Sequence, residues 1–187
     1  MKNFTVLHRL LHWILAISIL VTFVTGFLRM YWMGDDAIST VTTKHNINLS
    51  EKNLGTITHF FQEPMFQWHV YFAYVITFVF IGRVIYMIVK GIKFPNPFSK
   101  TTVNKDKFQG LVYIAFYVLI ASQIITGAII KYDFGSNYVI ETSVTIHKFA
   151  VYWTPIYILL HFAGIAISEN TTKKRLASKM IGGDSNY

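Results

Sequence analysis

Residues 144–168 read VTIHKFAVYWTPIYILLHFAGIAIS, an apolar stretch that contains His147 and His161. A membrane-spanning helix needs about 20 predominantly apolar residues, and this stretch meets that length. In a straight helix, fourteen residues rise about 21 Å and return to within about 40° of the same face. The stretch therefore predicts one spanning helix that presents an imidazole near each leaflet. An ionisable side chain in hydrocarbon is costly unless it is partnered, so both should face the interior of a helix bundle.

The composition is that of a membrane protein. Of 187 residues, 53% are hydrophobic and 14% are charged, whereas soluble domains have about 25% charged residues. Three further apolar runs, at 8–30, 67–89 and 108–130, have spanning length. The first run is longer than the apolar region of a signal peptide and no small-residue cleavage site follows it, so we expect an uncleaved span. The sequence predicts an all-α integral membrane four-helix bundle that forms a single domain over residues 1–187.

Basic residues crowd one side of the predicted bundle. The side that holds both termini has twelve Lys and Arg against three acids, and the opposite side has four against six, with Lys148 inside the last run left out of the count. The twelve are Lys2, Arg9, Arg83, Lys90, Lys93, Lys100, Lys105, Lys107, Lys173, Lys174, Arg175 and Lys179. Because loops rich in Lys and Arg stay in the cytoplasm, we expect both termini there. Attraction to anionic membrane lipids accounts for these residues, and a nucleic acid partner is not expected.

Four histidines fall into two pairs of matched depth. With the first helix entering hydrocarbon near Val6, helix rise puts His12 about 9 Å deep, and His161 lies about 10 Å from the same side of the membrane. His69 and His147 each lie just inside the opposite end of their own runs. Imidazole is a ligand of haem iron, and helix bundles hold cofactors between facing side chains. The pattern therefore predicts two b-type haems in the core of the bundle.

Other uses of these histidines fit the sequence less well. A zinc site needs three or four converging ligands, and no three of the histidines share a depth. A proton relay needs acids, and the four runs contain no Asp or Glu. Because the chain has no cysteine, covalent c-type haem and cysteine-ligated iron–sulfur clusters are excluded. The remaining alternative is that a histidine is buried and only forms hydrogen bonds.

Residues around the two pairs are further candidates for contact with a haem. His8 lies one turn before His12 at a shallower depth, so we expect it at the interface near a propionate, together with Arg9. Arg83 lies near the cytoplasmic end of the second run, where its guanidinium reaches headgroups or holds a propionate. Gly26 repeats the face of His12 near the opposite leaflet. It either leaves room for a planar cofactor or packs two helices together.

The rest of the chain carries fewer signals. The third run contains no histidine and should pack without ligating. The polar connection 31–66 is long enough to act as a cap or a docking surface. We expect His45 and His59 within it not to ligate, because neither has a partner at a diagnostic spacing. Pro64 is expected to break the chain just before the second span. The basic tail, 169–187, is expected to be disordered.

A set of short motifs at matching places in the four runs carries a family resemblance. The motifs are His12-Trp13, Thr25-Gly26, His69 with Arg83 and Pro95-Asn96-Pro97 beyond it, Thr126-Gly127, and His147 with His161 fourteen residues later. The chain resembles the bacterial cytochrome b561 family and the related di-haem cytochrome b subunits of nickel–iron hydrogenases and formate dehydrogenases. The resemblance covers all four runs. It implies a bacterial inner membrane protein with two b haems, ligated by His12–His161 and His69–His147, that exchanges electrons with the quinone pool.

Three functions follow as hypotheses, and no catalytic residue is predicted for any of them. The first is a quinone-linked oxidoreductase, for which the family suggests superoxide as substrate and Lys148, next to His147, as the residue that attracts it. The second is a membrane-anchor subunit that passes electrons between quinone and a larger hydrogenase-like or formate dehydrogenase-like partner. The third is a haem-binding or structural membrane protein without redox activity. For the first two, the electron would cross about 20 Å between the irons.

Overall fold

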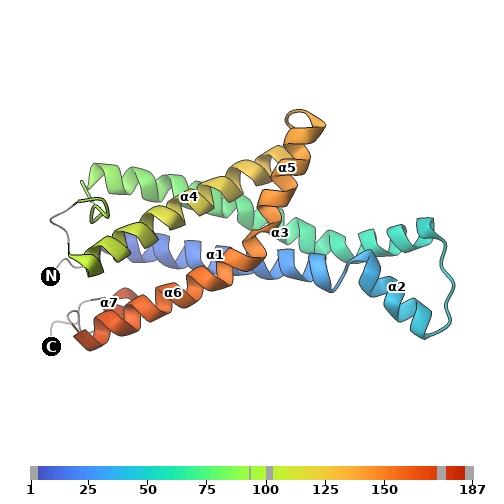
Figure 1. Cartoon of the computed structure of the whole chain (residues 1–187), viewed down its shortest axis with the longest axis horizontal. Helices are drawn as coiled ribbons and strands as arrows, with labels where there is room; N and C mark the ends of the chain where they lie inside the picture. The colour runs from blue at the N-terminus through green and yellow to red at the C-terminus, as the bar shows by residue number, and fades with distance from the viewer. Residues whose placement is uncertain (1–3, 93, 100–102, 172–175, 184–187) are drawn as a thin grey trace. The chain divides into compact units, whose positions relative to one another are not determined.

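The computed structural model describes residues 4–92, 94–99, 103–171 and 176–183, in which every regular element is a helix (Figure 1). The helices are α1 (Val6–Tyr31), α2 (Asp35–Lys44), α3 (Glu51–Val89), α4 (Asn104–Tyr132), α5 (Asn137–Lys148), α6 (Ala150–Thr171) and α7 (Leu176–Gly182). Six of the basic residues counted for topology, Lys2, Lys93, Lys100, Lys173, Lys174 and Arg175, lie outside the described residues.

The four predicted spans are confirmed. Four segments are long and apolar enough to cross a membrane, namely Val6–Tyr31, Glu51–Val89, Asp106–Tyr132 and Asn137–Asn170. Large apolar side chains on them are exposed, such as Phe78 at 74% and Leu159 at 70%. A soluble protein would hide such surface, whereas lipid tails cover it in a bilayer. The chain is therefore a helical membrane protein, as its composition predicts.

The chain divides into two compact units, residues 14–78 and residues 1–13 together with 79–187. The single domain expected over 1–187 stays a prediction.

In the unit of residues 14–78, the expected break at Pro64 is wrong. Helix α3 begins at Glu51 and runs through Pro64, so much of the predicted connection is helical. A proline inside a helix costs roughly 3 kcal/mol because it removes one hydrogen bond and crowds the preceding turn. Contacts on both sides of the proline offset that cost. Gln62 Nε2 donates to the backbone oxygens of Arg29 (3.3 Å) and Met33 (2.8 Å) at the end of α1.

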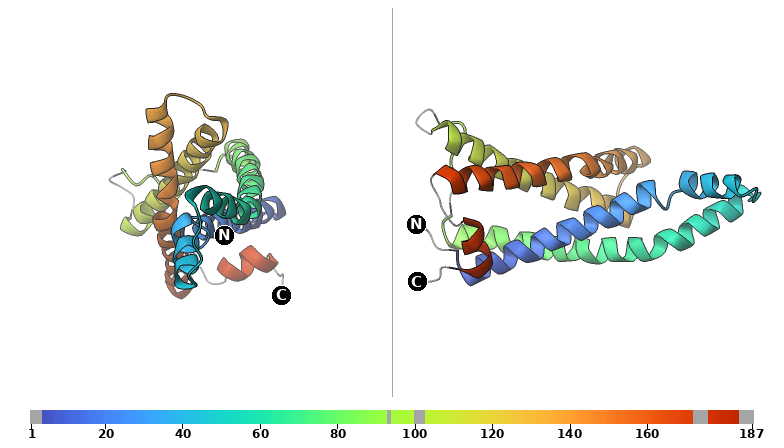
Figure 2. Two further views of the ribbon diagram at one scale, coloured as in Figure 1. Left: turned by 90° about the vertical axis from the view of Figure 1, so that its right-hand side faces the viewer. Right: turned by 90° about the horizontal axis from the view of Figure 1, so that it is seen from below.

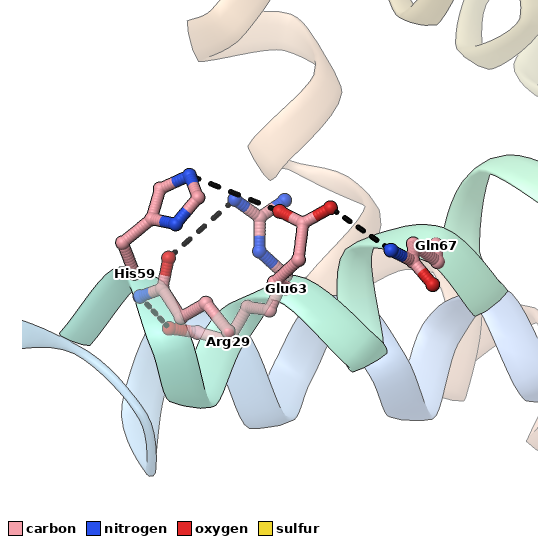
Figure 3. Close-up of polar contacts among 5 residues, drawn as sticks. Arg29, His59, Glu63 and Gln67 are labelled. Atoms are coloured by element: carbon pink, nitrogen blue, oxygen red, sulfur yellow. Dashed lines mark hydrogen bonds and ion pairs between the residues drawn. The ribbon is translucent and has the colours of Figure 1, made fainter. Parts of the chain in front are cut away.

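The Arg29 side chain makes further contacts that join the end of α1 to α3. Its guanidinium donates to Gln62 Oε1 at 3.5 Å and lies 4.7 Å from the ring centroid of Phe66. Figure 3 shows the Arg29 side chain at this site, together with the contact between His59 and Glu63 of α3. Because Gln62 and Phe66 flank Pro64, one arginine holds the helix on either side of the proline.

In the other unit, the fourth span is a bent helix, which corrects the straight one expected from its sequence. Helix α5 ends at Lys148 and α6 begins at Ala150, with a change of direction visible in Figure 1. Pro155, near the start of α6, lacks an N–H and crowds the turn before it, which weakens the helix close to the bend. The backbone oxygen of Ile146 accepts from Phe149 N (3.2 Å) and from Gln123 Nε2 of α4 (3.4 Å). The straight-helix estimate of the rise from His147 to His161 therefore does not apply.

The basic tail is not wholly disordered as expected, because residues 176–182 form α7. At its start, Ala177 N donates to the Glu169 carboxylate at 2.8 Å. At its end, Arg9 Nη1 donates to Ile181 O (3.3 Å) and Trp13 Nε1 donates to Met180 O (3.2 Å). These bonds satisfy terminal groups that a short helix cannot pair internally. Figure 2 shows α7 lying against the first turns of α1.

The segment that follows α3 packs on the start of α4. The Phe94 ring lies 4.9 Å from that of Tyr113 and 5.5 Å from that of Tyr117. Gly110 is buried beneath this segment, so a Cβ there would collide with the Pro95 carbonyl oxygen and approach Pro97 Cδ to 3.2 Å. The absence of a side chain at Gly110 therefore lets the Pro-Asn-Pro segment lie on the helix.

We expect Gly110→Ala to displace this segment and to lower stability by about 1–3 kcal/mol, the usual cost of overpacking. Thermal unfolding in detergent and limited proteolysis of residues 91–103 measure the effect. Gly164→Ala in α6 is the control, because a Cβ there meets nothing within 4 Å. Equal melting temperatures for the two variants would contradict this packing.

Candidate functional site

His12 of α1 and His161 of α6 face each other within the unit of residues 1–13 and 79–187. Their ring centroids are 6.0 Å apart and their planes are inclined by 37°. Bonds from a metal to imidazole nitrogens are about 2 Å long, so a metal ligated from both sides separates the ring centroids by about 6 Å. The spacing of the two rings would thus allow both histidines to ligate one metal ion.

Aromatic rings surround this pair. Tyr157 stacks on His161 with centroids 6.1 Å apart, and Phe116 of α4 lies 5.0 Å from Tyr157. On the other side, the Trp13 ring stands edge-on to His12 at 5.7 Å. Such rings keep water from the imidazoles, which favours ligation of a metal by neutral histidine.

Arg83 of α3 acts electrostatically on this pair. Its guanidinium lies close enough to the imidazoles of His8, His12 and His161 to interact with them electrostatically. Its Nε donates to the Tyr117 hydroxyl at 2.9 Å, which in turn donates to Met87 Sδ at 3.0 Å. Tyr117 had no assigned role in the sequence, because a tyrosine in a membrane helix gives no signal of what it holds. The arrangement fixes a cation near His12 and His161, as a propionate-holding residue requires.

His8 and Arg9, the other two residues expected near a propionate, have protein contacts of their own. The His8 ring stacks on Phe4 with centroids 5.3 Å apart and lies 6.2 Å from Tyr86. Arg9 donates to Ile181 O in α7.

His69 is held by α1 within the unit of residues 14–78. Its Nδ1 lies 3.1 Å from Thr25 Oγ1. Gly26, the next residue, faces the same ring, because a Cβ there would lie 3.4 Å from His69 Cε1. The missing side chain at Gly26 therefore gives room to an imidazole.

His147 is held by α4 in the same way, within the other unit. Its Nδ1 lies 3.0 Å from Thr126 Oγ1, and a Cβ on Gly127 would lie 3.2 Å from its Cε1. The third span, expected only to pack, thus contacts a candidate ligand. The repeated Thr-Gly pair was visible in the sequence, but its partner was not, because a sequence does not show which helix face meets a histidine.

The remaining histidines lie away from such arrangements. His45 is exposed at the end of α2, and the His59 side chain is 80% exposed, with Nε2 3.8 Å from the Glu63 carboxylate. Lys148 is exposed at the end of α5. Within the part of the chain that the structure describes, no three His, Cys, Asp or Glu side chains are grouped to hold a metal ion.

Comparison with known proteins gives one match. The sequence matches the family described as prokaryotic cytochrome b561 over residues 3–183, nearly its whole length. Neither a curated protein nor a solved structure matches it significantly. The match agrees with the four spanning helices and with the paired histidines. The chain therefore belongs to the prokaryotic cytochrome b561 family, bacterial membrane proteins that transfer electrons by means of b-type haem.

Proposed function

We propose that this cytochrome binds two b haems and carries electrons across the bacterial inner membrane to or from the quinone pool. The observation that carries the proposal is the His12–His161 pair, whose 6.0 Å separation fits one iron. When bound, haem supplies the one-electron redox chemistry, and the protein contributes ligation, orientation and electrostatics.

Two pairs of histidines and Arg83 would bind the two haems. His12 and His161 would hold one haem through their imidazole nitrogens, and the fixed guanidinium of Arg83 would bind a propionate. His69 and His147 would hold the second haem. This second assignment is supported by the identical surroundings of the two imidazoles, each beside a threonine hydroxyl and a glycine. Two unrelated histidines would have no reason to share such a setting.

Single alanine substitutions at His12, His161, His69 and His147 test the ligand assignment. Each should leave one haem per chain in place of two, because a b haem loses an axial ligand. Pyridine haemochrome absorbance relative to protein gives the count. His45→Ala and His59→Ala are controls that should retain two haems. A variant of His8 that loses a haem while His12→Ala keeps both would overturn the assignment in α1.

We also propose that both termini lie in the cytoplasm, on the basis of the twelve-to-three excess of basic residues. Reporter fusions after residues 40, 100 and 180 should give an outer signal at the first position and cytoplasmic signals at the other two. A cytoplasmic signal from the fusion at residue 40 would contradict this topology.

One observation favours superoxide as the electron donor. Lys148 is exposed and directly follows His147, so a cation accompanies a proposed ligand of the outer haem. In the balanced reaction, two superoxide anions each lose one electron and become dioxygen, while one quinone takes up two electrons and two protons. The positive charge would attract the anion and raise its rate of encounter.

Stopped-flow absorbance of the purified holoprotein tests both partners. We expect pulsed superoxide to reduce the haem at about 10⁸ M⁻¹s⁻¹ or faster, and added salt to slow the reaction. Lys148→Glu should slow it further, whereas Lys90→Glu, an exposed lysine at the end of α3, should not. A soluble quinone analogue should then reoxidise the haem. Slow reduction by superoxide with intact reoxidation by quinone would remove the superoxide role alone, and failure of reoxidation would contradict the quinone role.

A further inference from the structure

The same small arrangement occurs once in each unit of the chain. In residues 14–78, Thr25 Oγ1 contacts His69 Nδ1 at 3.1 Å. In residues 79–187, Thr126 Oγ1 contacts His147 Nδ1 at 3.0 Å. Both threonines are buried, with 6% of their surface exposed. The arrangement joins α1 to α3 in one unit and α4 to α5 in the other.

The backbone determines the direction of these two hydrogen bonds. A threonine hydroxyl has a single proton. Thr25 donates that proton to Val21 O at 2.8 Å, and Thr126 donates its own to Ser122 O at 2.7 Å. With that proton on the backbone oxygen, each hydroxyl oxygen is left to accept from the histidine, which assigns the imidazole proton to Nδ1. In a neutral imidazole the lone pair is consequently on Nε2.

The neighbouring glycine keeps each ring against its threonine. An added Cβ would lie 3.4 Å from His69 Cε1 at Gly26 and 3.2 Å from His147 Cε1 at Gly127. A larger side chain would push the ring away from the hydroxyl. A threonine and the glycine that follows it therefore position each imidazole, the threonine by a hydrogen bond and the glycine by leaving space.

We propose that Thr25 and Thr126 are positioning residues that hold His69 and His147 as Nδ1–H tautomers with Nε2 directed to iron. This inference rests on the proposed ligation of the outer haem by these two histidines. A hydrogen bond accepted from Nδ1–H fixes ring orientation and raises the basicity of the ligand. Because each hydroxyl also donates to a backbone oxygen, the two bonds polarise each other. The ligand set then stabilises ferric over ferrous haem and lowers the midpoint potential.

Thr25→Val and Thr126→Val remove the hydroxyl and keep a branched side chain. We expect each to raise the midpoint potential of one haem in a redox titration of the holoprotein, and to leave the other haem unchanged. The low-spin ferric signal of the same haem should shift in electron paramagnetic resonance. Retention of that haem should weaken by about 10-fold or more, as for other residues that orient metal ligands. Both substitutions should affect the same haem.

Controls separate this role from a general effect on the helices. Thr22 in α1 donates to Ser18 O at 3.0 Å, as Thr25 donates to Val21 O. Thr22→Val therefore removes an equivalent contact between a side chain and the backbone. Thr22→Val should leave both potentials unchanged. Thr25→Ser and Thr126→Ser keep the hydroxyl and should retain the native potentials and spectra, including where a valine variant is too unstable to purify.

An unchanged potential and spectrum in both valine variants would overturn the proposal. So would a shift in potential as large as that of Thr25→Val in a serine variant or in Thr22→Val. In that case, loss of one haem from His69→Ala and His147→Ala would leave the ligand assignment intact. If those alanine variants keep two haems, the proposed function fails, and the threonines have no ligand to position.

Discussion

Polar groups inside hydrocarbon must find partners within the protein, and this constraint explains most of the specific contacts in the chain. The His69 and His147 rings meet threonine hydroxyls that are themselves bonded to backbone oxygens. The guanidinium of Arg83 meets the Tyr117 hydroxyl. The backbone oxygen of Ile146, where the helix becomes irregular, accepts a hydrogen bond from the Gln123 side chain of α4. Few large apolar residues are buried, because lipid covers the apolar surface that a soluble protein would bury.

The same constraint shows which parts of the fold are readable from sequence. Spanning helices are long, apolar and free of acids, so their number follows from the distribution of apolar residues along the chain. Pro64 and Pro155 were harder to interpret. A proline disfavours a helix locally, and whether the helix continues depends on contacts made elsewhere. Helix α3 continues through Pro64, where Arg29 and Gln62 form hydrogen bonds. The fourth span instead bends at Phe149, before Pro155. The outcome at Pro64 cannot be predicted from its neighbours alone, because their partner, Arg29, lies on another helix.

For the candidate site, depth along a helix was predictable and side-chain partnership was not. Counting residues identified His12, the histidine whose ring lies beside that of His161, because rise per residue is nearly constant. The sequence did not predict Thr25 and Thr126 as hydrogen-bonding partners, because that role depends on the rotation of one helix relative to another. The order in the tail was missed for a similar reason. Helix α7 is stable only where Glu169, Arg9 and Trp13 meet its ends.

That closure of α7 has a consequence for the order in which the protein assembles. Arg9 and Ile181 are 172 residues apart in the chain, so their bond joins the start of α1 to a segment that is synthesised after all four spans. Bringing such distant residues together is entropically costly in an unfolded chain and becomes feasible once the intervening helices are in place. The start of α1 therefore receives its final partners after the fourth span has entered the membrane.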